Sequence, residues 1–188
     1  MRILILGPQG SGKGTQAQRI AAAYGVPHIA TGDMFRAAVA TGSELGAQVG
    51  PILERGDLVP DDLTIDLIRE RLAEEDGFVL DGFPRTVPQA EALDTMLDEI
   101  GKPLDAVILL QVSDDVATER LRERAAKEGR ADDSPEAIAN RLRQYHELTE
   151  LVVDRYQQAG IEVIVDGEQT MDGVFAAIQD ALEGVTAR

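Results

Sequence analysis

The clearest chemical signal in this chain is a glycine-rich run that ends in a lysine, Gly7-Pro8-Gln9-Gly10-Ser11-Gly12-Lys13. The spacing G-x-x-x-x-G-K is typical of a phosphate-binding loop. Glycines let the backbone curl until several N–H groups point at one anion, and the lysine brings a positive charge to the terminal phosphates. The alternative is a glycine-rich turn between a strand and a helix, with a surface lysine. The position of the run, between an apolar segment and a helical one, favours the phosphate loop.

One residue departs from the general pattern. Position 14 is glycine, where a serine or threonine hydroxyl usually contacts magnesium, and the hydroxyl arrives one residue later at Thr15. A magnesium ion is still expected to accompany the nucleotide, held through water and the phosphates.

Arginines supply a second set of phosphate ligands. The chain has only three lysines, and a guanidinium group can bind a phosphate with two parallel hydrogen bonds. Arg85 lies in a Phe-Pro-Arg turn after a short apolar segment that ends at Asp81. Arg85 could bind a phosphate, or it could only form an ion pair with a nearby carboxylate. Asp81 could position magnesium beside the phosphate loop, or it could only be a helix cap. Arg122 does not share a helix face with Arg124, so we expect Arg124 to face the ligand and Arg122 to be on the surface.

Length and composition exclude several classes of protein. The 188 residues suit one domain, and the net charge of −16 argues against binding to nucleic acid or to an anionic membrane. With no cysteine there is no disulfide, thiolate zinc site or thiol nucleophile. No apolar run approaches the roughly 20 residues of a membrane span, and the start of the chain lacks the pattern of a signal peptide. We therefore expect a cytoplasmic protein.

Apolar runs and helix signals alternate along the chain. Strands are expected at residues 2–6, 26–30, 77–80, 106–111 and 161–165. Helices are expected at residues 13–24, 31–40, 43–55, 61–72, 87–100, 113–124, 134–158 and 171–182. Thr31, Ser43 and Ser134 are plausible N-caps. This alternation predicts an α/β fold, a parallel five-stranded sheet with helices on both faces and a ligand site at the carboxyl ends of the strands.

Four segments together resemble the adenylate kinase family. The phosphate loop continues as Lys13-Gly14-Thr15-Gln16, which is similar to the GKGTQ form of that family. Three further segments follow in the family's order: Thr31-Gly32-Asp33-Met34-Phe35-Arg36; Asp81-Gly82-Phe83-Pro84-Arg85 with Gln89; and Arg130-Ala131-Asp132-Asp133 with Asn140-Arg141-Leu142. The resemblance covers the chain from Met1 to about the last helix.

The resemblance implies a role for each matching residue. The ATP-binding residues would be Gly10, Ser11, Gly12, Lys13, Gly14, Thr15, Arg124 and Gln169. The AMP-binding residues would be Thr31, Arg36, Asp57, Leu58, Val59, Gly82, Phe83, Pro84, Arg85, Gln89, Arg130 and Arg141. The catalytic cations would be Lys13, Arg85, Arg124, Arg130 and Arg141. Asp81 and Asp33 would orient water around magnesium.

The resemblance also implies a domain plan with a short lid. Residues 1–188 would form one domain, with a core of 1–29, 60–124 and 134–188 and a monophosphate-binding region at 30–59. The lid would be residues 125–133, much shorter than in the longer bacterial members, so no zinc is expected.

The implied activity is reversible, magnesium-dependent transfer of a phosphoryl group from ATP to AMP, giving two ADP and maintaining the adenine nucleotide pools. The partners would be ATP, AMP and ADP, and the protein would be a monomer. Two alternatives stay open: a kinase for UMP/CMP or GMP, and a nucleotide-binding regulator that uses the phosphate loop as a switch. His28 and His146 are expected to be structural or exposed.

Overall fold

A computed structural model of the protein describes residues 1–128 and 134–186. Five parallel strands form one sheet in the order β2-β3-β1-β4-β5. They are β1 (Arg2–Leu6), β2 (His28–Ala30), β3 (Phe78–Asp81), β4 (Ala106–Gln111) and β5 (Glu162–Asp166). The predicted α/β fold is confirmed, and the strand ends differ from expectation by no more than two residues.

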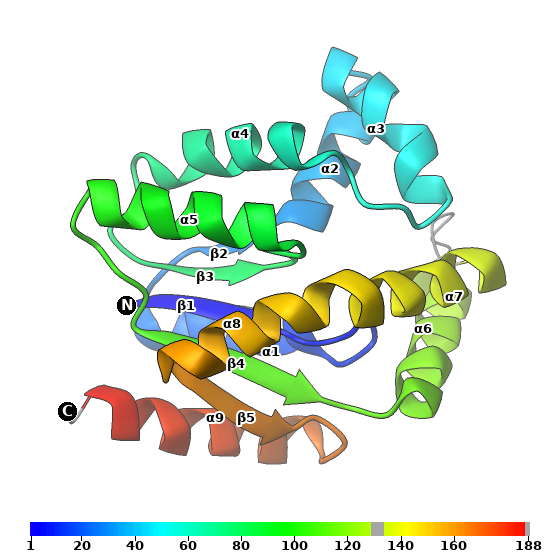
Figure 1. The fold of residues 1–188 in the computed structure, drawn as a ribbon. Coiled ribbons are helices and arrows are strands. Elements are labelled where there is room, and N and C mark those ends of the chain that lie inside the picture. Colours follow the sequence, from blue (N-terminus) through cyan, green and yellow to red (C-terminus); the bar gives the residue numbers. More distant parts are fainter. Residues whose placement is uncertain (129–133, 187–188) are drawn as a thin grey trace.

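Helices connect the strands and cover the sheet on both sides (Figure 1). They are α1 (Lys13–Tyr24), α2 (Thr31–Ala40), α3 (Glu44–Glu54), α4 (Asp61–Leu72), α5 (Val87–Glu99), α6 (Asp114–Glu128), α7 (Pro135–Gln144), α8 (Glu150–Ala159) and α9 (Met171–Thr186), with a π-helical segment η1 (Tyr145–Thr149) between α7 and α8. None of the helices in the described residues is both long enough and apolar enough to cross a membrane.

Four details of the helix predictions were wrong. The helices α6 and α9 end at Glu128 and Thr186, each four residues beyond the expected end at 124 or 182. Thr31 is not an N-cap but the first residue of α2, and its cap position is held by Ala30 without a side-chain hydrogen bond. The helix expected over residues 134–158 is not regular, because η1 interrupts it. The predicted caps Ser43 and Ser134 are confirmed, since each side chain accepts a hydrogen bond from a backbone N–H in the first turn.

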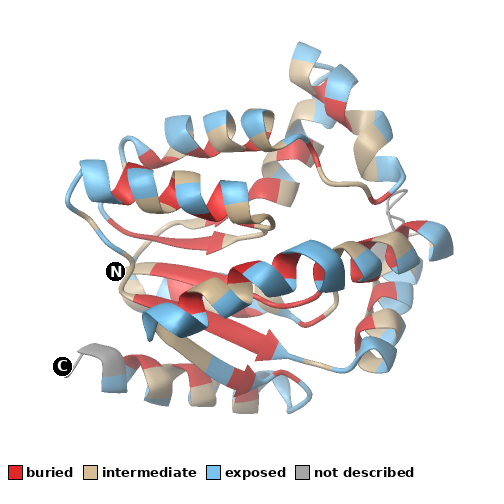
Figure 2. Ribbon diagram, in the orientation of Figure 1, coloured by how far each residue is buried: buried red, intermediate tan, exposed pale blue. Residues whose placement is uncertain are grey.

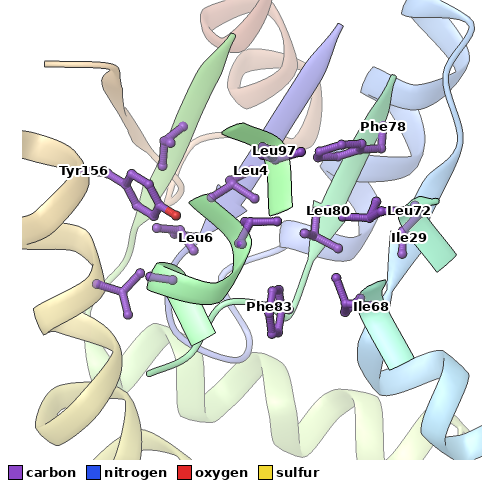
Figure 3. Packing of buried hydrophobic residues seen from close by; sticks show 14 of the residues in the cluster. Leu4, Leu6, Ile29, Ile68, Leu72, Phe78, Leu80, Phe83, Leu97 and Tyr156 are labelled. Carbon is purple, nitrogen blue, oxygen red and sulfur yellow. The ribbon is translucent and has the colours of Figure 1, made fainter. Parts of the chain in front are cut away.

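The alternating side chains of the strands divide the core into two layers. On one face, Leu4 and Leu80 pack with residues of α4, α5 and α8, including Ile68, Leu97 and Tyr156 (Figure 3). On the other face, the intervening strand residues pack with α1 and α9; this cluster includes Ile3, Ile5, Val79, Ile108, Ile20 and Ile178. Both faces of the central strands are therefore buried (Figure 2), as a parallel sheet requires.

Two smaller apolar clusters lie outside these layers. Phe35 and Val49 join α2 to α3, and the resulting pair of helices stands away from the sheet (Figure 1). Ala117 and Leu121 of α6 pack against Ile138 and Leu142 of α7. The space at the carboxyl ends of the strands is thus bordered by two helix pairs, each with an apolar cluster of its own.

The register of the strands brings the candidate site residues close together. Ile5 of β1 pairs with Asp81 of β3, so Asp81 ends its strand beside the start of the phosphate loop. The loops that follow parallel strands leave the sheet at one edge, which is where ligands bind in such folds.

The contact between α2 and α3 gives a test of how tightly the helix pair is packed. A Cβ added to Gly46 would overlap the backbone carbonyl of Ala38, so we expect Gly46→Ala to lower the free energy of unfolding by about 1–3 kcal/mol. Gly50, on the same helix, is the matched control. Its added Cβ would be 3.7 Å from the nearest atom, a Val39 side-chain carbon, and Gly50→Ala should stabilise the helix by about 0.5–1 kcal/mol. Denaturant unfolding of both variants checks this, and equal stability would contradict the packing.

Candidate active site

The phosphate loop connects β1 to α1 and is held in a tight curve. Gly10 has a φ of 86°, and an added Cβ there would overlap the carbonyl of Ala117 in α6. The backbone N–H of Ser11 donates to the carbonyl of Pro8 at 3.1 Å. Lys13, the first residue of α1, donates from Nζ to the same carbonyl at 2.7 Å, so its ammonium group lies over the loop.

Lys13 and Asp81 are the central charges of this site. Burial lowers the pKa of Lys13 to about 8; Asp81 opposes this shift, and Arg85 and Arg124 add to it. Burial alone would raise the pKa of Asp81, but the nearby His28 ring and the charges of Lys13 and Arg85 keep it below its usual value. Asp81 is therefore a carboxylate at neutral pH.

Asp81 also faces the phosphate loop. Its Oδ2 would lie 3.5 Å from a Cβ added to Gly14, and it is 3.6 Å from Nε2 of the half-buried His28. His28 is thus a neighbour of the site's main carboxylate. His146 is on the surface, where its ring nitrogens contact Asp114 and Glu150.

Hydrogen bonds of its backbone and of its side chain hold Arg85 in the turn after β3. Its Nε donates to the carbonyl of Gly82 at 2.8 Å, and its backbone N–H donates to Oε1 of Gln89 at 2.8 Å. The other end of the Gln89 amide donates to Asp61 at 2.7 Å. Burial and the charge of Arg141 lower the pKa of Arg85 to about 10, with Asp81 opposing, so Arg85 keeps its charge at neutral pH.

A cavity of about 500 Å³ collects these side chains at the carboxyl ends of the strands. Six cationic residues line it, although the chain as a whole has a net charge of −16. They are Lys13, Arg36, Arg85, Arg120, Arg124 and Arg141. Arg141 is only 8% exposed, which is unusual for an arginine. The other five are partly buried, and Asp33, Asp57 and Asp81 also line the cavity, so cations outnumber carboxylates there, which favours a polyanion.

Most of the predicted ATP residues line this cavity. Gly10, Gly12, Lys13, Gly14, Thr15 and Arg124 are at its wall. Ser11 is buried in the same loop, and its hydroxyl oxygen has no hydrogen-bond partner among the described residues. Gln169 lies in the loop between β5 and α9, where its side chain donates to the carbonyl of Asp166, and it is not part of the cavity wall.

A smaller cavity of about 40 Å³ adjoins Arg85 on the side of α2 and α3. Its lining includes most of the predicted AMP residues, namely Thr31, Asp57, Leu58, Val59, Gly82, Arg85 and Gln89. Thr31 is buried, and its hydroxyl donates to the carbonyl of Asp81 at 3.4 Å. The Phe83 side chain packs in the sheet core instead, and Pro84 lines a narrow space beside Lys13.

The outcome differs for three further arginines named in the sequence analysis, Arg36, Arg122 and Arg130. Arg36 borders the large cavity and forms an ion pair with Asp33, with 2.6 Å between Nη2 and Oδ1. Arg122 is exposed, as expected. Arg130 and most of the predicted lid lie outside the described residues.

Two residues that sequence reasoning did not select join the parts of the site. Arg120 donates to the carbonyls of Ser11 and Gly167, which ties α6 to the phosphate loop and to the turn after β5. Asn140 of α7 donates from Nδ2 to the Arg55 carbonyl at 3.1 Å and to Asp57 Oδ1 at 2.7 Å. The spacing of Arg120 and Arg124 by four residues placed both on one helix face, but no local pattern indicated the contact of Asn140.

The carboxylates suit a magnesium ion that arrives with a nucleotide. In the described part of the chain, no group of three or more histidines, aspartates and glutamates could hold a metal by itself. Mg²⁺ commonly uses one or two carboxylates together with phosphates and water, and Asp81 beside the phosphate loop fits that requirement.

Comparison with known proteins identifies the family. The family model described as adenylate kinase matches residues 5–161. The chain is 48% identical over 187 residues to the adenylate kinase of Stenotrophomonas maltophilia (strain R551-3), covering 98% of this chain and 100% of that protein. It is also 48% identical over 185 residues to the adenylate kinase of Xanthomonas euvesicatoria pv. vesicatoria (strain 85-10), covering 97% and 99%. This chain belongs to the adenylate kinase family. The resemblance predicted from the motifs is confirmed, and adenylate kinases in general use magnesium-bound nucleotides.

The lowered pKa of Lys13 predicts a stability cost in this adenylate kinase family member. A lysine whose pKa is about 8 in the folded state and 10.5 when unfolded opposes folding below pH 8, and this penalty fades between pH 8 and 10.5. We expect Lys13→Met to raise the free energy of unfolding of the nucleotide-free protein by about 1–2 kcal/mol at pH 7, after the lost bond to Pro8 is deducted.

Denaturant unfolding at pH 7 and at pH 10 measures this difference, which should shrink at the higher pH. The control is Lys102→Met, because Lys102 forms a surface ion pair with Asp76 and its loss should change stability by less than about 0.5 kcal/mol. A Lys13→Met protein that is less stable than the wild type at pH 7 would contradict the burial argument.

Proposed function

We propose that this protein is an adenylate kinase that transfers the terminal phosphoryl group of ATP to AMP, reversibly and with magnesium, to give two ADP. The observation that carries the proposal is one cavity lined by cations from separate elements. Lys13 comes from the phosphate loop and the start of α1, whereas Arg36 comes from α2 and Arg85 from the turn after β3. A second anion needs a second set of cations, which a nucleotide-binding regulator would not require.

The donor side of the proposed reaction is the phosphate loop. Residues 10–15 would wrap the ATP phosphates with backbone N–H groups, and the N-terminus of α1 would add partial positive charge. Lys13 would move from the Pro8 carbonyl to the terminal phosphates, since a phosphate is a stronger acceptor than a carbonyl. Arg124 would neutralise charge on the same side. The adenine contact of Gln169 stays a prediction.

The acceptor side is built from the α2–α3 region and the turn after β3. Arg36 and Arg85 would bind the phosphate of AMP, while Thr31, Gln89 and the backbone at residues 57–59 would surround its base. Gly82 and Pro84 would complete the wall beside Arg85, and any part played by Phe83 would come from its backbone, since its side chain is in the core. Arg141, with Arg130 in its predicted role, would close over the transferring group.

Phosphoryl transfer requires positioning and charge neutralisation rather than a protein nucleophile. Magnesium would be held by the phosphates and by water bound to Asp81. Asp33 stays a predicted second contact, although its carboxylate is paired with Arg36. Water has to be excluded during transfer, and we assign this to movement of the short lid (residues 125–133) and of the region at residues 30–59, relative to a core of 1–29, 60–124 and 134–188. A cytoplasmic monomer is part of the same proposal.

The nucleotide preference separates this function from its nearest alternatives. With ATP and magnesium, we expect the protein to phosphorylate AMP at least tenfold more efficiently than UMP, CMP or GMP, because hydrogen-bond differences in the base pocket discriminate strongly. A coupled assay on a panel of monophosphates measures kcat/KM for each. A preference for UMP, CMP or GMP would reassign the substrate. Calorimetry that detects one nucleotide per molecule at saturation, with no transfer, would favour the regulator.

Arg85 is expected to matter for rate and not for folding. Arg85→Ala removes a partly buried cation from the acceptor side, so kcat/KM for AMP should fall by about 10²–10⁴. The melting temperature should stay close to that of the wild type, because removing Arg85 relieves its repulsion with Arg141. The matched control is Arg122→Ala on the exposed side of α6, which should keep the wild-type rate. Near-normal transfer by Arg85→Ala would remove it from the site.

A further inference from the structure

The backbone carbonyl of Arg85 is bound by a residue far away in the sequence. The hydroxyl of Thr149 donates to it at 3.0 Å, and Thr149 is 7% exposed. Gln89 binds the N–H of the same residue, and Gly82 binds its side chain. Arg85 is therefore held at its N–H, its carbonyl and its guanidinium group, with Thr149 of η1 as the contact from a distant part of the chain.

Thr149 behaves differently from other threonines in this chain. The hydroxyls of Thr41, Thr64 and Thr95 each donate to the carbonyl four residues earlier, which is the common local bond of a threonine at a helix. For Thr149 that carbonyl would belong to Tyr145, and it accepts the backbone N–H of Glu150. The Thr149 hydroxyl is directed across the molecule to Arg85 instead.

The π-helical segment η1 explains how Thr149 reaches that position. Tyr145 still donates its N–H to the carbonyl of Arg141, four residues back, whereas Glu150 donates to Tyr145, five residues back. One extra residue is thus inserted between α7 and α8, which follow one another along a single course in Figure 1. Such insertions in helices are frequent at functional sites.

The extra residue changes which side chains share a face. A regular α-helix turns by about 100° per residue, so Arg141 and Thr149, eight residues apart, would point about 80° away from each other. With one residue absorbed by η1, the pair is spaced as if seven apart, which leaves an offset of only about 20°. Arg141 then lines the cavity of about 500 Å³, where its positive charge helps to lower the pKa of Arg85. Thr149 reaches the Arg85 carbonyl.

We propose that Thr149 is a positioning residue for phosphoryl transfer, and that η1 aligns it with Arg141 so that one helix course brings Arg141 to the cavity and holds the Arg85 carbonyl through Thr149. The inference rests on the proposed function, because it concerns the orientation of the arginine assigned to AMP. Thr149 touches no substrate in this arrangement. It acts by holding the turn after β3, and a small displacement of an aligned group has a large effect on rate.

The test compares two substitutions at Thr149 that separate the hydroxyl from the methyl group. Thr149→Val replaces the hydroxyl by a methyl group and so keeps the branched shape without the donor, whereas Thr149→Ser keeps the hydroxyl and loses the methyl group. We expect Thr149→Val to lower kcat about tenfold and to raise the KM for AMP several-fold, with the KM for ATP within about twofold of the wild type. Thr149→Ser should keep at least half of the wild-type kcat. The control is Thr95→Val, which removes a surface hydroxyl that donates to Glu91 and should leave the kinetics unchanged.

A double-mutant cycle with Arg85→Lys separates positioning from a general loss of structure. If Thr149 acts through Arg85, Thr149→Val should change kcat by less than about twofold in the Arg85→Lys background. An equal tenfold loss in both backgrounds, or a Thr149→Ser protein as slow as Thr149→Val, would overturn the proposal. Thermal melting of each variant accompanies the assays, and Thr149→Ala carries the same test if valine prevents folding.

The failure of this inference can be told apart from failure of the proposed function. Wild-type protein that transfers no phosphoryl group to AMP would overturn the proposed function itself. Active wild-type protein with an equally active Thr149→Val variant would overturn only the positioning role. Calorimetric titration with AMP alone adds a readout that does not depend on turnover, and a several-fold weaker affinity in Thr149→Val is the result expected.

Discussion

The structure depends on holding like charges together before any ligand is present. Lys13, Arg85 and Arg141 share one cavity, and the pKa values of Lys13 and Arg85 are lowered by burial and by neighbouring cations. Left to themselves, such side chains would separate and turn to water. They remain because backbone contacts fix them: Lys13 through the carbonyl of Pro8, and Arg85 through Gly82, Gln89 and Thr149. Binding of a polyanion to such a site is especially favourable, because the anion removes the repulsion between the cations.

The cations come from several different elements, so the site depends on how those elements are supported. Lys13 and Asp81 stand at the ends of central strands or just beyond them, where the core is packed on both faces. Arg36 and Arg141 are carried by helix pairs that have small apolar clusters of their own. Lys13 of the donor side and Arg85 of the acceptor side therefore follow strands of the packed sheet, whereas Arg36, Arg124 and Arg141 are carried by the two helix pairs. Asn140 connects the two helix pairs through Arg55 and Asp57, which links the wall of the smaller cavity to the helix that carries Arg141.

Sequence patterns predicted the parts of the site that depend on local rules. Local sequence was enough to predict the phosphate loop around Lys13, the alternation of strands and helices, and the caps at Ser43 and Ser134, because each follows from neighbours in the chain. The π-helical segment could not be predicted, because one extra residue hardly changes a hydrophobic pattern whose spacing already varies between three and four residues. The contacts of Thr149 with Arg85 and of Asn140 with Asp57 span more than 60 residues, and short polar side chains in helices give no signal of such partners. Roles such as that of Gln169 stay predictions, because motif resemblance names a residue without giving its orientation.

The acidity of the chain and the basic character of its cavity are compatible because they act over different distances. At physiological salt the Debye length is about 8 Å, so carboxylates spread over the outer surface are largely screened from a nucleotide in the cavity. The cationic side chains act at contact distance and partly out of water, where screening is weak. Of the 16 lysines and arginines in residues 1–128 and 134–186, ten lie outside the cavity lining, in a chain with 34 acidic residues, so the surrounding surface offers little to a long polyanion. The placement of the few cations, and not their number, thus favours a small, compact phosphate ligand over nucleic acid.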